Sequence, residues 1–156
     1  MSEAGPLNVH ASLVRIGANG ILVRGGAQSG KSSLALCLLR LARREGFDAR
    51  LVADDRVDLA RREDGVVGTA PAVLTGLLEI AGIGLVRLPV SASAPISLVV
   101  DLSPRPPRLP QTGHCDLLGV LVDHIALPER SPVLGAEIVL TLLDPTTERV
   151  DLDATD

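Results

Sequence analysis

Hydrophobic residues fall into short runs along the chain, and glycine, proline or charged residues separate one run from the next. Residues 9–16 (VHASLVRI) and 21–24 (ILVR) each predict a short strand that contains β-branched side chains. The four residues 17–20 between them end in Asn19-Gly20, a pair typical of tight hairpin turns. We therefore expect an antiparallel hairpin at the start of the fold.

A helix-forming run over residues 32–44 follows a glycine-rich stretch, and its first two turns carry apolar side chains nearly all round. Arg40, Arg43 and Arg44 lie near its C-terminal end, where positive charge suits the helix dipole. Gly46 can end the helix. We interpret these arginines as a solvated helix end and not as a binding patch.

The rest of the chain predicts strands and turns up to a final helix. Ser131 before Pro132 is typical of a helix start, and Pro145 stops the run, so we expect this helix over residues 131–143. Four prolines make residues 104–113 an irregular surface loop. Further strands are expected over residues 50–53, 57–61, 66–68, 96–102 and 117–125, with a hairpin between the second and third of these, and a short turn or helix over residues 71–78.

The length of 156 residues favours one domain with a substantial core. Hydrophobic residues make up 46% of the chain and charged residues 22%, a balance typical of globular proteins and not of disordered ones. We expect a flexible N-terminus over residues 1–8, a folded domain over 9–144 and an acidic tail over 145–156.

Composition excludes several classes of partner. A net charge of −4, one Phe and no Trp or Tyr argue against nucleic acid, because neither a basic surface nor aromatic stacking is available. No apolar run approaches the roughly 20 residues that a bilayer requires, and the N-terminus lacks the pattern of a secretory signal. We therefore expect a cytoplasmic protein, in which Cys37 and Cys115 are buried thiols without chemistry.

Residues 25–32 (GGAQSGKS) satisfy the P-loop motif G-x-x-x-x-G-K-[ST], between a predicted strand and a predicted helix. Glycines let the backbone N–H groups gather around a phosphate at a helix N-terminus. Lys31 is the only lysine in the chain, so a compact ammonium was kept where arginine's planar fork would not fit. The residues that we expect to bind a nucleotide are Gly25, Gly26, Ala27, Gln28, Ser29, Gly30, Lys31, Ser32 and Ser33.

Two adjacent carboxylates, Asp54 and Asp55, follow the strand predicted over residues 50–53. Paired acids at the end of a strand beside a P-loop indicate a site in which one carboxylate holds magnesium together with the Ser32 hydroxyl, while the other acts on a nucleophile. The alternative is an aspartate pair that only forms a turn.

Four stretches, taken in order, resemble the HPr kinase/phosphorylase family, bacterial P-loop enzymes that phosphorylate a seryl hydroxyl of the phosphocarrier protein HPr. They are residues 9–11 (VHA), the P-loop, residues 51–57 (LVADDRV), which are similar to that family's L-[IV]-A-D-D-x-V, and residues 78–84 (LEIAGIG), which resemble its signature L-E-I-R-G-[LI]-G. The resemblance covers residues 9–143, equivalent to the catalytic domain alone, as in the family's short forms. It implies an α/β fold: a single compact P-loop domain with a mixed β-sheet and flanking helices.

The resemblance also implies roles for individual residues. Lys31 contacts phosphate, Asp55 takes the proton of the acceptor serine with His10 beside it, and Ser32, Asp54 and Glu79 hold or orient Mg²⁺. ATP is the implied nucleotide, an HPr-like phosphocarrier is the implied partner, and a homo-oligomer is possible. His114 and His124 match nothing in the family's motifs.

One departure concerns the signature arginine, whose place is taken by Ala81. Arg56, Arg87 and Arg108 are candidates to replace its charge from nearby loops. Another departure is a longer segment between Ser32 and Asp54, expected to be a surface change. We expect an ATP-dependent protein serine kinase with weak phosphorylase activity at most. The alternatives are a nucleotide-binding regulatory module that transfers no phosphate, and a small-molecule P-loop kinase.

Overall fold

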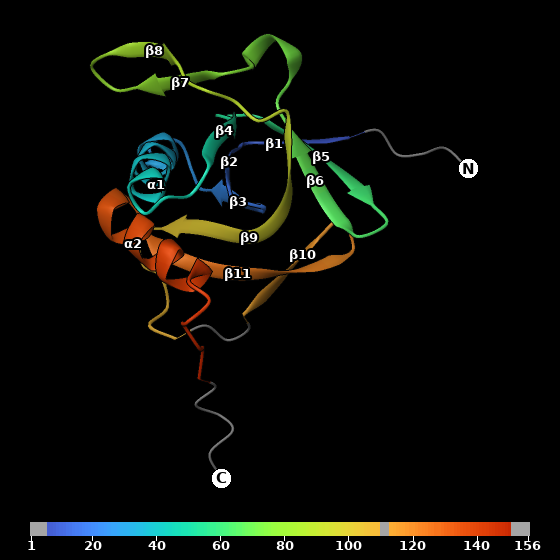
Figure 1. Ribbon diagram of the computed structural model, residues 1–156, viewed down its shortest axis with the longest axis vertical. Helices are drawn as coiled ribbons and strands as arrows, with labels where there is room; N and C mark the ends of the chain where they lie inside the picture. The colour runs from blue at the N-terminus through green and yellow to red at the C-terminus, as the bar shows by residue number, and fades with distance from the viewer. Residues whose placement is uncertain (1–5, 110–112, 151–156) are drawn as a thin grey trace.

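The computed structural model describes residues 6–109 and 113–150. In this part of the chain, the helices α1 (Lys31–Arg44) and α2 (Pro132–Leu143) pack against each other on one face of a curved mixed β-sheet (Figure 1). A two-stranded hairpin stands apart beyond α1. The strands are β1 (Leu7–Val9), β2 (Ala11–Ile16), β3 (Asn19–Arg24), β4 (Ala49–Ala53), β5 (Val57–Arg62), β6 (Gly65–Thr69), β7 (Leu77–Ile80), β8 (Gly84–Arg87), β9 (Ser93–Ser103), β10 (His114–Leu117) and β11 (Val120–Pro128), and one 3₁₀ turn spans Ala72–Leu74.

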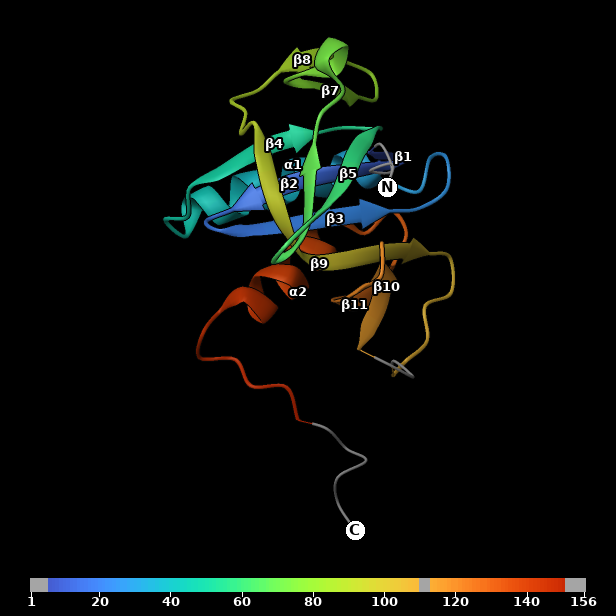
Figure 2. The same cartoon turned by 90° about the vertical axis from the view of Figure 1, so that its right-hand side faces the viewer.

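The long strand β9 organises the sheet, whose order is β1-β5-β6-β9-β3-β2-β4. Its first residues pair antiparallel with β6, and its remainder lies between two parallel neighbours, β3 and β11. Figure 2 shows β9 bending through the molecule, with the β7–β8 hairpin on one side and α2, β10 and β11 on the other. This bend makes the fold a curled sheet and not a flat one.

Side chains on the two faces of the sheet build two apolar clusters. Along β2, Leu13 points into one cluster and Val14 into the other, as the period of two in a strand requires. The cluster with Val14 contains the inner faces of α1 and α2, and the cluster with Leu13 contains residues of β5, β6 and β10. Strands β2 and β3 are therefore buried on both faces, which holds the loop that follows β3 in a fixed place.

The α/β class, the mixed sheet and the flanking helices agree with the sequence-based expectation. The hairpin of β2 and β3, the helix α1, the strand β4 and the hairpin of β5 and β6 all lie within two residues of their predicted positions. Helix α2 begins at Pro132 and ends at Leu143, as expected. None of the described helices is long and apolar enough to cross a membrane.

Some predicted elements differ from the structure. Residues 117–125 are not one strand, because Leu118 and Gly119 adopt positive φ angles of 52° and 82° and form the turn between β10 and β11. The N-terminus is not loose throughout residues 1–8, since β1 begins at Leu7. Residues 104–109 form the expected irregular loop and residues 145–150 have no regular structure, while 110–112 and 151–156 lie outside the described residues.

Candidate active site

The glycine-rich loop, residues 25–30, joins the buried strand β3 to α1. A side chain at Gly25 would place its Cβ atom 2.4 Å from Ser29 Oγ, and Gly30 has a φ of 99°, so both positions require glycine. The first backbone hydrogen bond of the helix runs from the Leu34 amide to the Gly30 carbonyl at 3.0 Å. The amides that precede it, those of residues 31–33, therefore remain available to an anion at the helix N-terminus.

Lys31 is 8% exposed and closes this loop. Its Nζ donates hydrogen bonds to the carbonyls of Gly25 and Gly26, each at 3.0 Å. Ser29 Oγ is buried and has no hydrogen-bond partner among the described residues. A buried ammonium and an unpaired hydroxyl inside a ring of amides fit the chemistry of a bound phosphate group.

Asp54, at the end of β4, is 6% exposed and collects hydrogen bonds from three segments. Ser12 Oγ donates to its carboxylate at 2.6 Å, Ser32 Oγ at 2.9 and 3.0 Å, and the Glu79 amide at 3.3 Å. The sequence analysis missed Ser12, whose only signal was a small polar side chain in the largely apolar strand β2. Asp54 thus fixes the start of α1 relative to β2 and β7.

Asp55 faces the opposite way from its neighbour. It adopts a φ of 68°, a region that aspartate tolerates better than most residues, and its side chain is 65% exposed. His10 Nε2 lies 2.5 Å from Asp55 Oδ1. His10 is not inside a strand as predicted but in the break between β1 and β2, and this break lets its ring reach Asp55.

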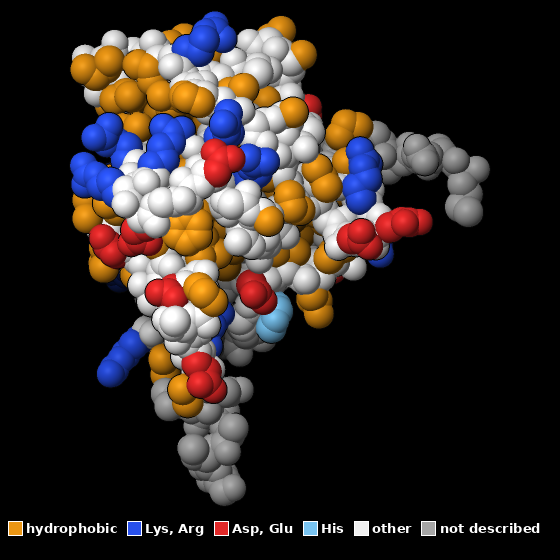
Figure 3. All heavy atoms as spheres, viewed as in Figure 1, with side chains coloured by type: hydrophobic (Ala, Val, Ile, Leu, Met, Phe, Trp, Pro, Cys, Tyr) orange, Lys and Arg blue, Asp and Glu red, His pale blue; other side chains and the backbone are white. Residues whose placement is uncertain are grey.

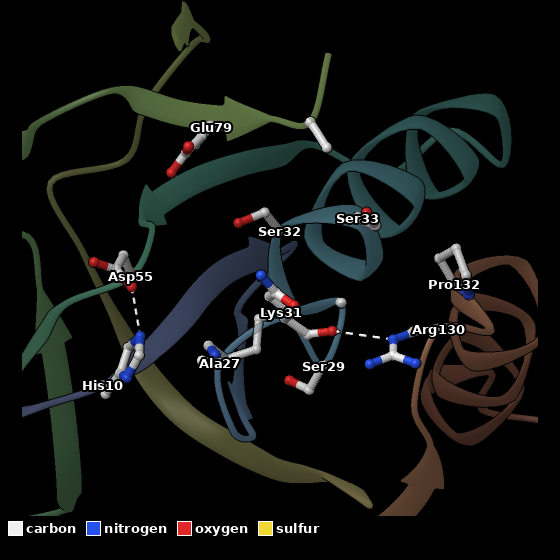
Figure 4. Close-up of a pocket in the computed structure, with 13 residues that line it drawn as sticks. His10, Ala27, Ser29, Lys31, Ser32, Ser33, Asp55, Glu79, Arg130 and Pro132 are labelled. Atoms are coloured by element: carbon white, nitrogen blue, oxygen red, sulfur yellow. Dashed lines mark hydrogen bonds and ion pairs between the residues drawn. The ribbon is translucent and has the colours of Figure 1, made fainter. Parts of the chain in front are cut away.

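Glu79 comes from the hairpin of β7 and β8, which the sequence analysis did not anticipate. Leu78 is fully buried in the cluster under α1, and the next residue, Glu79, is exposed. Figure 4 shows the Glu79 carboxylate pointing from β7 toward the space above Ser32 and Asp55. Ile83 and Leu85 of this hairpin are exposed. Figure 3 shows hydrophobic side chains gathered on the surface at the hairpin end of the molecule.

These side chains surround an open cavity of about 710 Å³. Gly25, Gly26 and Asp54 adjoin the cavity without lining it. The residues that line it are His10, Ala27, Gln28, Ser29, Gly30, Lys31, Ser32, Ser33, Asp55, Glu79, Ala81, Arg130 and Pro132. Arg130 was not singled out from the sequence, because it precedes α2 and lies about a hundred residues from the loop.

The three arginines proposed to replace the missing charge do not line this cavity. Arg56 donates to Asn8 Oδ1 at 3.4 Å, and Arg87 donates to the Thr75 carbonyl at 3.4 Å. Arg108 lines a second cavity, of about 660 Å³, beside β10, β11 and α2. The expectation that one of these three reaches the site is therefore not met by this structure.

His114, His124 and Cys115 also line the second cavity. Arg24 donates two hydrogen bonds of 2.8 Å to Asp101, and His124 Nε2 lies 2.7 Å from the same carboxylate. Burial by itself raises the pKa of Asp101, but hydrogen bonds and charges from Arg24 and His124 outweigh burial and hold the pKa below its usual value of 3.8. This network supports the strand ends behind the glycine-rich loop.

Three side chains beside the loop could hold Mg²⁺. The Ser32 hydroxyl and the Asp54 and Glu79 carboxylates are oxygen donors, as this cation prefers. No group of three or more His, Cys, Asp or Glu that could hold a metal occurs among residues 6–109 and 113–150.

Comparisons with known proteins point to one family. The family model described as the HPr Serine kinase C-terminal domain matches residues 3–128. The HPr kinase/phosphorylase of Limosilactobacillus reuteri is 36% identical over 138 residues, which cover 80% of this chain and 41% of the relative. That of Lactiplantibacillus plantarum is 45% identical over 80 residues, which cover 51% of this chain and 24% of the relative. The chain thus spans about two fifths or less of the length of these curated relatives.

A solved structure supports the same relationship at the level of the fold. It is the Hpr(Ser) kinase/phosphatase from Coxiella burnetii, with a TM-score of 0.71 and 29% sequence identity. The match covers 88% of this chain and 96% of the solved chain.

Proposed function

The chain belongs to the family of the HPr serine kinase C-terminal domain, and on this premise we propose that it transfers the γ-phosphoryl group of ATP to a serine of an HPr-like phosphocarrier protein. The observation that carries the proposal is that one open cavity is lined by both Lys31, from the glycine-rich loop, and the paired His10 and Asp55. The loop and lysine suit a phosphate donor, and the exposed pair suits an acceptor. We include a cytoplasmic location in this proposal, because ATP and the phosphocarrier are found in the cytoplasm.

The loop binds and orients the triphosphate. Amides of residues 31–33 point at the phosphate oxygens, and Lys31 exchanges its bonds with the carbonyls of Gly25 and Gly26 for bonds to phosphate. The buried Ser29 hydroxyl gains a partner in the same step. For Lys31, the exchange replaces two contacts within the loop by charge-assisted contacts to phosphate. The Gly26 carbonyl still accepts a hydrogen bond from the Ser29 amide at 3.2 Å.

The residues that would hold Mg²⁺ are Ser32, Asp54 and Glu79. Bound there, the ion would supply positive charge to offset that of the phosphates. Asp54 accepts hydrogen bonds from the Ser32 hydroxyl and from the Glu79 amide. These bonds hold the start of α1 and the strand β7 beside Asp54, so the three residues lie close together.

Asp55 acts as the base. The serine Oγ forms a bond to the γ-phosphorus while the bond from that phosphorus to the oxygen of the leaving ADP breaks, and the hydroxyl proton passes to the Asp55 carboxylate. His10 holds this carboxylate in place. Because Asp55 is 65% exposed and His10 43% exposed, a serine on the surface of a folded protein can reach them, which favours a protein acceptor over a small molecule.

A regulatory module that binds nucleotide without transferring phosphate is the second candidate. The observation behind it is Ala81, which lines the cavity at the place of the family's signature arginine and offers no charge to the transition state.

The deciding experiment incubates the protein with labelled ATP, Mg²⁺ and the HPr-like carrier from the same source, with Asp55→Asn and a carrier lacking its acceptor serine as controls. We expect acid-stable, alkali-labile phosphoserine with the unaltered pair only. If Asp55→Asn transferred label to the carrier as well as the unaltered protein does, Asp55 would not be the base. Tight nucleotide binding without any transfer would favour the regulatory module.

A further inference from the structure

Arg130 is tied to the glycine-rich loop by its backbone and by its side chain. Its amide donates to the Ser29 carbonyl at 3.1 Å, and its Nε donates to the Gln28 carbonyl at 3.2 Å. Figure 4 shows this guanidinium beside the loop, reaching from the segment that leads into α2. A residue that comes a hundred positions later in the chain is thus anchored on the phosphate-binding loop.

The backbone of Arg130 is unusual for its residue type. Its φ is 55°, a left-handed conformation that a long side chain rarely adopts, and the bond to Ser29 helps to hold it there. Gly30 faces the same segment, because a Cβ atom on Gly30 would lie 3.4 Å from the Arg130 nitrogen. The loop and the start of α2 therefore constrain each other.

The charge of Arg130 is not neutralised within the described part of the chain. Arg15 and Arg50 pair with Asp48, and Arg24 pairs with Asp101, whereas Arg130 has no such carboxylate partner there. Its terminal nitrogens likewise have no hydrogen-bond acceptor among residues 6–109 and 113–150. The Arg130 Nε is held by the Gln28 carbonyl, and the two terminal nitrogens are available to donate hydrogen bonds to an anion.

Charge in the cavity argues for the same role. The lining contains two fixed positive charges, Lys31 and Arg130, and two carboxylates, Asp55 and Glu79. Without Arg130, a single lysine would face both carboxylates and the polyanionic nucleotide. Ala81 adds nothing, so the second cation of this site comes from the far side of the loop.

We propose that Arg130 binds the terminal phosphate of the nucleotide and stabilises its charge during transfer, and so supplies the guanidinium that Ala81 does not. This inference rests on the proposed function for the transfer step, but not for nucleotide binding. Residues 129–150 lie outside the range that the family model matches, so the assignment comes from the geometry of this chain and not from that match.

Binding measurements test the proposal without any transfer. In Arg130→Ala, the Kd of a non-hydrolysable ATP analogue should rise about tenfold in the presence of Mg²⁺, while the Kd of ADP should change less than threefold, because ADP lacks the group that Arg130 contacts. Arg130→Lys should lie between the two proteins, since a lysine keeps the charge and loses the fork. Arg40→Ala, an exposed arginine on α1, is the matched control and should change neither Kd.

Transfer gives a second readout. Arg130→Ala should lower the rate of carrier phosphorylation about 10²–10³-fold, and adding Ala81→Arg should restore part of it. Equal losses of affinity for ADP and the ATP analogue in both Arg130→Ala and Arg130→Lys would overturn the proposal, because they would show that Arg130 only shapes the loop. Unchanged affinities in both variants would overturn it too. If the unaltered protein phosphorylated no carrier and the selective loss of affinity remained, the proposed function would fail while the phosphate contact stood.

Discussion

Two adjacent aspartates at the end of β4 have different surroundings. Asp54 is buried under four hydrogen-bond donor contacts from Ser12, Ser32 and Glu79, whereas Asp55 turns outward through a positive φ and meets His10. Two consecutive residues thus differ in role: Asp54 organises the site, and we propose that Asp55 takes the proton of the acceptor.

This division predicts different defects for two conservative variants. Asp55→Asn should leave the affinity for Mg-nucleotide within about threefold and lower transfer about 10²–10⁴-fold, the usual contribution of a general base. Asp54→Asn should instead raise the Mg²⁺ concentration needed for nucleotide binding, measured by titration. Equal losses of nucleotide affinity in both variants would contradict the assignment.

The contribution of Asp101 to the stability of the fold depends on pH. Its pKa is lowered in the folded protein, so it stabilises the fold above its usual value of 3.8, and this stabilisation disappears as pH falls through the lower folded pKa. Asp101→Asn should lower the free energy of unfolding at pH 7 by about 1–3 kcal/mol, because the half-buried Arg24 loses its partner. In urea unfolding, the difference between the two proteins should shrink below pH 3.8; a difference that stayed constant down to pH 2 would exclude this linkage.

Residue chemistry in the motifs could be read from the sequence, but contacts between distant segments could not. The glycine-rich loop and the paired aspartates can be recognised because the residues of each motif are close together in the sequence. Ser12 carries only a weak local signal, and Arg130 carries none. Ser12 meets Asp54 only when β4 pairs with β2, and Arg130 meets the loop only when the start of α2 packs against it.

The same limit applies to secondary-structure elements. Leu118 sits in the middle of an apolar run, and a leucine at positive φ is rare, so the run predicted one strand where the chain makes two. The hairpin of β7 and β8 was missed for a similar reason: its apolar residues at 77–86 were continuous enough to hide the turn at Gly82. The hairpin of β2 and β3 was placed within two residues, but its turn is Gly17-Ala18, and Asn19-Gly20 begin β3.

The contact between β3 and β9 leaves no room for a side chain at Gly20. A Cβ atom there would lie 2.2 Å from the Pro95 carbonyl oxygen, at the point where the register between the strands shifts. Gly20→Ala should therefore destabilise the fold by about 1–3 kcal/mol, measured by thermal or urea unfolding. Gly26→Ala is the comparison, because a Cβ at Gly26 has no atom within 4 Å; equal stability of the two variants would show that the sheet adjusts at Gly20.

At the scale of the whole molecule, nucleotide binding should raise the stability of the fold. The loop connects the central strand β3 to α1, so a ligand held there stabilises the native state. At a hundred times its dissociation constant, Mg-ATP should add about 2.7 kcal/mol and shift the thermal melt upward by several degrees. Lys31→Ala should lose most of this shift, and a shift of the same size in that variant would show that the nucleotide binds elsewhere.

The position of β9 has a consequence for synthesis of the chain on the ribosome. β3 and α1 are made early, but β9 must follow before the edge of β3 is paired, and α2 must follow before the inner face of α1 is fully covered. At about 5–20 residues per second, the stretch from Lys31 to Arg130 takes roughly 5–20 s to translate. During that time the nascent chain presents an open strand edge and a bare apolar helix, both of which favour aggregation. Codons and chaperones that act between residues 45 and 130 should therefore decide the yield of folded protein more than those before or after them.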